Sequence, residues 1–371
     1  GYIRYKDMNL FKGSILVVLS FFLSTCSSNN QPLLIDREIF FEEPDISHLQ
    51  LSPNGAYVAF LSPYKGHRNI WMKPLEASFD DSFPVTVEDQ NIIYDFFWSR
   101  DGKHIIYMQD QGGDENDNIF AITVDSISEG IIPRTTNLTD FEGVRAIIYH
   151  KSRIDPDLLF IGLNYRDRAW HDLYSLRVST GELNLIEENT RRYLSWILDY
   201  NDNLRLATTA GEDGINRLWR IDPNGKTLLY SWDIYETVYP PVFAASNEHI
   251  YLISNVGDDV NIIKLYLMSV ATGDIELLEG DPEGQVDLDN FYLSDRTLNL
   301  LYTTYIDDYT RKYFWDKEFE RHYRKVAANF KGHEVNLYNT TADERLWLVQ
   351  IYSDINPGMV YLYNTMNGNL T

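Results

Sequence analysis

Short apolar segments separated by polar turns run along most of the chain. The stretch DGKHIIYMQDQGGDENDNIFAITVD, residues 101–125, shows the pattern: an Asp-Gly turn, an apolar strand, a Gly-Gly break among acidic residues, and a second, alternating strand. Alternation of apolar and polar residues between breaks rich in Gly, Asp and Asn is typical of β-strands joined by tight turns. This stretch is therefore predicted to form a β-hairpin.

The same plan recurs and predicts a repeat of about 48 residues. Each repeat has an apolar strand, a turn rich in Asp, Asn, Gly or Pro, a second strand, a polar loop and a third strand, and several add a short fourth strand. The centres of the third strands lie 45 to 54 residues apart, at Trp71, Phe120, Tyr174, Trp219, Tyr266, Phe314 and Leu362. Such repeats are typical of radially packed small sheets. We therefore predict an all-β fold, a seven-bladed β-propeller.

The predicted propeller occupies residues 33–371. Its blades are expected near residues 44–85, 92–139, 144–190, 193–234, 238–281, 286–331 and 333–371. The sixth repeat departs from the plan, because apolar residues recur at helical spacing after its third strand, at Phe319, Tyr323, Val326 and Phe330. With Gly332 at the position of a helix C-cap, they predict one helix inserted in blade six, with its aromatic stripe packed against the propeller.

Residues 1–32 differ in composition from the rest of the chain. From Met8 the sequence MNLFKGSILVVLSFFLSTCSSNNQ has a short basic region, an apolar run and small residues, followed by a polar linker. This layout is that of a secretory signal, and LSTC resembles the lipobox of bacterial lipoproteins, although Thr25 is unusual there. We expect an exported, periplasmic protein whose Cys26 is lipidated and anchors it to a bacterial membrane. The alternatives are an uncleaved anchor or cleavage elsewhere. Cys26 is the only cysteine of the chain, so no disulfide is expected.

The charge balance restricts the partners. With 55 acidic and 32 basic residues the formal net charge is -23, which repels phosphate backbones and anionic lipid surfaces. Nucleic acid is therefore not expected as a partner, and contact with a membrane is expected only through the lipid anchor.

Several longer strings carry a family resemblance. FFWSRDGKHIIYMQDQGGDEN, LNYRDRAWHDLYSLRVSTGELNLIEEN and the late RLWLVQIYSD together resemble the N-terminal propeller of exported bacterial serine peptidases of the prolyl oligopeptidase family, which includes acylaminoacyl and dipeptidyl peptidases. The resemblance implies a propeller that caps the active site of a C-terminal α/β-hydrolase domain, so that short peptides enter and folded proteins do not. In that domain a serine on a G-x-S-x-G elbow precedes the Asp and His of the triad.

This chain has no G-x-S-x-G segment. No catalytic residue, metal ligand or cofactor is therefore assigned, and the hydrolase domain is expected to be a partner that the chain lacks. An alternative is a stand-alone periplasmic lipoprotein propeller that binds proteins, similar to the Tol-system propeller. Such a propeller would close its last blade, and residues 37–41 could supply an N-terminal strand that completes it.

Two polar clusters are candidate contacts with substrate or with the hydrolase domain. The first is Asp114, Glu115 and Asn116 in the acidic turn of the predicted hairpin. An ordinary hairpin turn is the favoured interpretation, with an interdomain or substrate contact, or a calcium site, as alternatives. The second cluster contains Arg166, Arg168 and His171. Its arginines are suited to bidentate binding of a peptide carboxylate, but pairing with nearby surface carboxylates is favoured.

Overall fold

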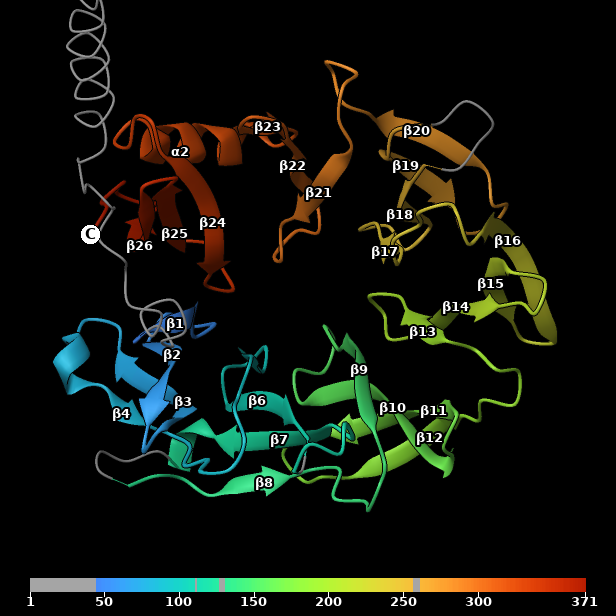
Figure 1. Ribbon diagram of the computed structural model, residues 1–371, viewed down its shortest axis with the longest axis horizontal. Helices are drawn as coiled ribbons and strands as arrows, with labels where there is room; N and C mark the ends of the chain where they lie inside the picture. Colours follow the sequence, from blue (N-terminus) through green and yellow to red (C-terminus); the bar gives the residue numbers. More distant parts are fainter. Residues whose placement is uncertain (1–44, 111, 127–130, 256–260) are drawn as a thin grey trace, which may run out of the picture. The chain divides into compact units, whose positions relative to one another are not determined.

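The computed structural model describes residues 45–110, 112–126, 131–255 and 261–371. Residues 45–371 form one compact unit, in which the described strands make seven antiparallel sheets that follow one another around a ring (Figure 1). The fold is therefore the predicted seven-bladed β-propeller. Cys26 and the candidate closing strand at residues 37–41 lie outside the described residues.

Five blades have four described strands and two have three. Blade one contains β1 (Ser47–Leu51), β2 (Tyr57–Tyr64), β3 (His67–Pro74) and β4 (Phe83–Pro84). Blade two contains β5 (Phe96–Trp98), β6 (His104–Gln109), β7 (Asn118–Thr123) and β8 (Thr135–Asn137). Blade three contains β9 (Ala146–Lys151), β10 (Leu158–Asp167), β11 (Trp170–Arg177) and β12 (Leu183–Glu187). Blades four and five contain β13 (Ser195–Leu198), β14 (Leu204–Ala210), β15 (Ile215–Asp222), β16 (Gly225–Asp233); β17 (Val242–Phe243), β18 (His249–Ser254), β19 (Lys264–Ser269) and β20 (Ile275–Glu279). Blades six and seven contain β21 (Leu288–Leu293), β22 (Leu300–Ile306), β23 (Thr310–Phe314); β24 (Glu334–Thr340), β25 (Leu346–Ser353) and β26 (Asn356–Asn364).

The repeat read from the sequence coincides with the strand order. Each of the seven predicted strand centres lies in the third strand of its blade, from Trp71 in β3 to Leu362 in β26. The predicted hairpin of residues 101–125 is also present, as β6 paired with β7 from His104 opposite Thr123 to Gln109 opposite Asn118. In the blades whose first strand is labelled in Figure 1, that strand lies towards the middle of the ring, and the fourth strand, where one is present, lies towards its rim.

The hydrophobic core is divided among the seven interfaces between neighbouring blades. Between blades one and two, for example, Ile70 of β3 packs in the same cluster as Phe96 of β5. The last cluster joins blade seven to blade one and includes Leu51 and Leu348. The Leu51 N–H also donates to the Asn339 side-chain oxygen at 2.6 Å. Packing and hydrogen bonds between these two blades therefore close the ring, and no described strand from before β1 pairs with blade seven.

One α-helix is present among the described residues, α2 (Lys317–Ala327), directly after β23. Asp316 caps its N-terminus by accepting the Phe319 N–H at 2.8 Å. The predicted helix is thus confirmed in blade six, but it ends at Ala327 rather than near Gly332. After Ala327 the chain continues in tighter turns, in which the Asn329 and Phe330 N–H groups donate to the Val326 and Ala327 carbonyl oxygens, each at 3.0 Å. The Asn329 side chain also donates to the carbonyl oxygens of Lys325 and Val326, which satisfies acceptors at the helix end. In the described part of the chain, no helix is both long and apolar enough to span a membrane.

Candidate functional site

The turns between the first and second strands gather at one end of the propeller. They share a backbone pattern: Gly102 N–H donates to the Ser99 carbonyl at 2.9 Å, and Asp202 N–H donates to the Asp199 carbonyl at 3.1 Å in the equivalent turn of blade four. The second position of each turn is occupied, in chain order, by Pro53, Arg100, Arg153, Tyr200, Ala245, Asp295 and Ala342. The repeat therefore delivers one side chain per blade to the same end of the ring.

Hydrogen bonds between blades hold these turns in place. Asp202 accepts from the Ser152 hydroxyl at 2.6 Å and contacts His150 Nε2 at 3.0 Å, which ties blade three to blade four. Glu344 accepts from the Ser294 hydroxyl at 2.8 Å, which ties blade six to blade seven. The side chains at this end are therefore carried by a connected rim.

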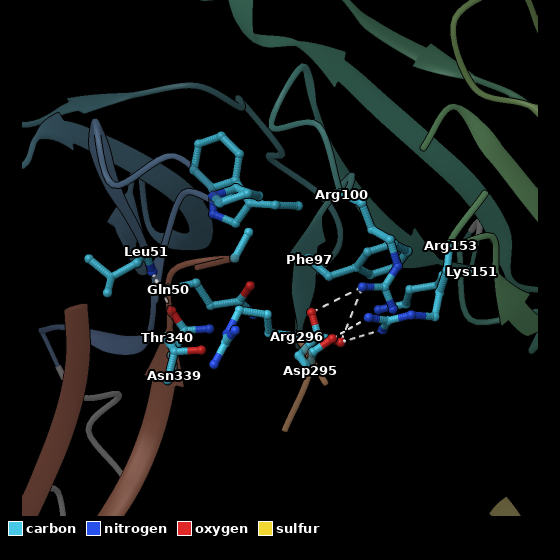
Figure 2. A pocket seen from close by; sticks show the side chains of 13 residues that line it. Gln50, Leu51, Phe97, Arg100, Lys151, Arg153, Asp295, Arg296, Asn339 and Thr340 are labelled. Carbon is cyan, nitrogen blue, oxygen red and sulfur yellow. Dashed lines mark hydrogen bonds and ion pairs between the residues drawn. The ribbon is translucent and has the colours of Figure 1, made fainter. Parts of the chain in front are cut away.

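A pocket of about 420 Å³ lies within this rim (Figure 2). We call it the axial mouth, because its walls come from the first strands β1, β5, β9 and β24 and from the turns that follow first strands. Its lining consists of Gln50, Leu51, Pro53, Phe97, Trp98, Arg100, Lys151, Arg153, Asp295, Arg296, Asn339, Thr340 and Ala342. Side chains from five blades therefore meet in one pocket.

Three of these residues form an ion cluster that spans the ring. Asp295 comes from blade six, and Figure 2 shows its carboxylate next to Arg100 of blade two and Arg153 of blade three. Arg100 donates to both carboxylate oxygens, at 3.1 and 3.0 Å, and Arg153 donates to one of them at 3.0 Å and to the Asp295 backbone carbonyl. Although the Asp295 side chain is partly exposed, its partial removal from water would raise its pKa, but the two guanidiniums outweigh this effect and lower that pKa. Asp295 is therefore a carboxylate bound by two arginines.

Lys151 adds a further positive charge beside this cluster. Its ammonium lies 3.4 Å from the centre of the Phe97 ring, a cation–π contact. Part of the Lys151 side chain is exposed, but partial desolvation by the surrounding protein, followed by repulsion from Arg100, lowers its pKa to about 8, so the side chain is still mainly charged at neutral pH. No described carboxylate forms an ion pair with it, and Arg296 has its own partner, Glu344, at 3.8 Å. In a protein of net charge -23, the axial mouth thus holds three cations around one carboxylate.

The predicted acidic turn lies elsewhere, in the hairpin between β6 and β7. Asp114 and Glu115 are exposed, and the Asn116 N–H and side-chain amide donate to the Asp114 carboxylate at 3.0 and 3.1 Å. Glu115 has a positive φ of 60°. Within the described residues, no group of three or more histidine, cysteine or acidic side chains is arranged to hold a metal ion. The geometry is that of a hairpin turn with local Asx hydrogen bonds.

The second predicted cluster lies in the hairpin between β10 and β11. Arg166 donates to both oxygens of the buried Asp172 carboxylate, at 2.9 and 2.7 Å, and Asp172 also accepts the Asn189 N–H at 2.6 Å. Arg168 donates to the backbone carbonyls of Gly143 and Glu142. The half-buried His171 has a lowered pKa, because burial disfavours its charged form and Arg145 repels it. Both arginines therefore already have partners within the chain.

Both predicted clusters occur between second and third strands, whereas the axial mouth follows first strands. Successive turns of an antiparallel sheet lie at opposite ends, so the predicted candidates and the mouth are at opposite ends of the propeller. The sequence patterns did not predict a role for Arg100, Lys151, Arg153 or Asp295. The available signal was the second position of the repeated turn, which carries a charge in SRDG, SRID and SDRT.

The end that carries the predicted candidates also exposes aromatic side chains. More than 60% of the surface is exposed for Tyr94, Ile234, Tyr235, Tyr309 and Ile355, all of which lie in turns after second strands or in connections between blades. We call these five residues the apolar face. At the opposite end, the described apolar residues exposed to this extent are Ile131, Ile154 and Met366, none of them aromatic.

Comparison with known proteins confirms the resemblance seen in the motif strings. No protein-family model matches the chain. The dipeptidyl aminopeptidase BIII of Pseudoxanthomonas mexicana is 25% identical over 343 residues, which cover 91% of this chain and 48% of that protein. The chain thus spans about half the length of this curated relative.

Solved structures show the same fold. A prolyl endopeptidase structure matches 88% of this chain and 49% of its own with a TM-score of 0.56 and 11% identity. The β-propeller domain of the Trilobed protease from Pyrococcus furiosus, described as having an open velcro topology, matches with a TM-score of 0.54, 13% identity, and coverage of 88% of this chain and 94% of that domain. The chain is a seven-bladed β-propeller that is similar in sequence to about half of a dipeptidyl aminopeptidase and shares its fold with about half of a prolyl endopeptidase.

Proposed function

We propose that this propeller controls substrate entry in a serine peptidase of the prolyl oligopeptidase family that acts on short peptides. The kinship with a dipeptidyl aminopeptidase and the fold shared with a prolyl endopeptidase support the family. The catalytic step, acyl transfer through a serine ester with an oxyanion hole, would belong to a hydrolase domain.

The observation that carries the gating role is the bridged axial mouth. The Arg100–Asp295–Arg153 cluster joins blades two and three to blade six across the opening, leaving a pocket of about 420 Å³. Pockets of roughly 300–1,000 Å³ hold ligands of the size of a short peptide, and a folded domain is far larger. A pocket of this size would receive a peptide segment and reject a folded protein.

The apolar face supports a docking site for the hydrolase domain at the other end. Exposed aromatic residues are enriched in protein interfaces, and Tyr235 and Ile355 are 87% and 90% exposed. The first strand β1 begins at this end. A hydrolase domain seated there would place its active site opposite the axial mouth, so that peptides would reach it through the propeller.

We further propose that the protein is exported and held at a bacterial membrane by a lipid on Cys26. The support is the leader-like sequence before the propeller, with its apolar run and LSTC segment. Metabolic labelling with a radioactive or alkyne fatty acid would test this. Label in the wild-type protein and none in Cys26→Ser is the expected result.

The peptidase role is tested on the protein that the gene encodes. The reading frame should continue into a domain with G-x-S-x-G followed by Asp and His. The purified product should react with a fluorophosphonate probe and cleave short peptides faster than folded proteins, and substitution of the elbow serine by alanine should remove both properties. A reading frame without a hydrolase domain, or a product that ignores the probe, would overturn the proposal and direct the search to protein partners of a binding propeller.

A further inference from the structure

The ion cluster of the axial mouth contains more cations than a bridge to a single carboxylate needs. Two arginines and one lysine face a single carboxylate, and that carboxylate reaches them from the opposite side of the ring. The Asp295 side chain remains 58% exposed. Two arginines are thus held by one acidic side chain that stays accessible to solvent.

We propose that the axial mouth binds a carboxylate of a peptide through Arg100, Arg153 and Lys151, with Asp295 as an internal competitor for the same cations. Guanidinium groups bind carboxylates through strong, charge-assisted hydrogen bonds, and Arg100 already donates from Nη1 to both Asp295 carboxylate oxygens, at 3.1 and 3.0 Å. Asp295 therefore occupies the position that a ligand carboxylate would take.

Other features of the mouth fit such a ligand. Lys151 has no ionic partner among the described residues and lies on the Phe97 ring, so it supplies a charge that the cluster leaves unneutralised. Arg153 lies over the Tyr200 ring, with 5.7 Å between the guanidinium carbon and the ring centre. These ring contacts hold the cations in place, which reduces the entropy lost when a ligand binds.

Displacement of Asp295 would also release blade six from blades two and three at the mouth. The same event that binds an acidic group would thus remove the bridge across the opening. That the ligand is a peptide rests on the proposed function, whereas the carboxylate site itself rests only on the mouth.

Calorimetric titration of the chain with blocked tripeptides tests the inference without any catalytic readout. Acetyl-Ala-Ala-Ala as the free acid is compared with its C-terminal amide, and acetyl-Ala-Glu-Ala amide is compared with acetyl-Ala-Gln-Ala amide. In at least one pair, the acidic peptide should bind at least ~10-fold more tightly than its neutral counterpart. Raising the salt concentration should weaken that binding. The first pair reports a terminal carboxylate, and the second reports an acidic side chain.

Variants separate a binding site from a structural bridge. Asp295→Asn removes the competitor and should tighten binding of the acidic peptide roughly tenfold, a gain that a damaged fold cannot produce. Arg153→Gln should weaken it by a similar factor. The matched control is Asp213→Asn, which breaks the ion pair with Arg217 in the turn between β14 and β15 at the other end of the propeller, and it should leave binding unchanged.

The inference is overturned if acid and neutral peptides bind alike or not at all, or if Asp295→Asn fails to tighten binding. These outcomes can be distinguished from a failure of the proposed peptidase function. A missing hydrolase domain leaves the titration unaffected, and a confirmed peptidase that does not discriminate acid from amide at the mouth would refute the carboxylate site alone.

Discussion

Replacing Phe319 by alanine should destabilise the propeller strongly, because this helix residue packs between two blades. Its side chain is only 6% exposed. The ring is stacked on Tyr302 of β22, with centroids 5.2 Å apart, and on Trp347 of β25, at 4.8 Å. Helix α2 thus contributes to the core between blades six and seven.

The size of the effect follows from this packing. A buried aromatic side chain removes at least ~150 Å² from water, which is worth about 4 kcal/mol at ~25 cal/mol per Å². Alanine retains about 1 kcal/mol of this, while removal of the stacking on Tyr302 and Trp347 adds roughly 1–2 kcal/mol. The expected decrease in the free energy of unfolding is therefore about 4 kcal/mol, within the usual range for Phe→Ala in a core.

Urea denaturation followed by tryptophan fluorescence measures this decrease, and Trp347 reports on the altered site directly. With a slope of ~3 kcal/mol per molar urea, the midpoint should fall by roughly 1 M. Tyr309→Ala is the control, because that side chain is 78% exposed in a turn and its removal should change the free energy of unfolding by no more than about 0.5 kcal/mol. A decrease below about 1 kcal/mol for Phe319→Ala would refute the assignment of α2 to the core.

Three further substitutions test other parts of the fold by the same assay. Gly162→Ala should lower the free energy of unfolding by about 1–3 kcal/mol, because the added Cβ would lie 2.5 Å from the Tyr149 ring. Gly225→Ala is the control and should be nearly neutral, because there is open space around Gly225. Equal effects of the two substitutions would contradict the packing around Gly162. Asn69→Ala should lower the free energy of unfolding by about 3 kcal/mol, since the fully buried amide oxygen accepts from the Thr86 hydroxyl at 2.8 Å and from the Glu88 N–H at 2.7 Å. A urea midpoint within error of wild type would show that these hydrogen bonds do not stabilise the fold. For Asp281, hydrogen bonds from Arg311 lower the pKa of the carboxyl, so wild type should be more stable than Asp281→Asn above pH ~4, and this advantage should disappear as the pH falls through the lowered pKa. An advantage independent of pH would show that the charge is not involved.

The fold was predictable because it repeats. Strand patterns that are individually weak became decisive when seven of them recurred at similar spacing, and each predicted strand centre, such as Phe120 in β7, lies in the third strand of its blade. The helix was predicted from four apolar residues, but it ends in tighter turns capped by the Asn329 side chain, which hydrophobic periodicity does not reveal. Phe330 lies beyond the helix end and still packs in the core, with its ring 4.8 Å from that of Tyr361. Hydrophobic spacing thus predicted burial better than helix length.

The axial mouth was not predicted, because its residues are distant along the chain. Arg100 and Asp295 are separated by 195 residues and meet only across the ring formed by the packed blades. Motifs are recognised where residues cluster in sequence. The two predicted clusters of this kind lie in hairpins, and their polar groups are engaged in local hydrogen bonds. Aligning the repeats and comparing the second position of each first turn would have placed Arg100, Arg153 and Asp295 at one end.

The two ends of the propeller are chemically different, and that difference constrains how the proposals fit together. The mouth end presents cations on turns that are tied between blades, through Asp202 and Glu344 among others, while the other end presents Tyr94, Tyr235 and Tyr309 to solvent. A charged peptide that entered at the apolar face would meet aromatic rings before any cation. Entry at the axial mouth would instead bring an acidic group to Arg100 and Arg153 first. The Asp295 carboxylate would have to leave these two arginines before the peptide could advance. Selection by charge and opening of the mouth would then be one event, carried out by the same three side chains.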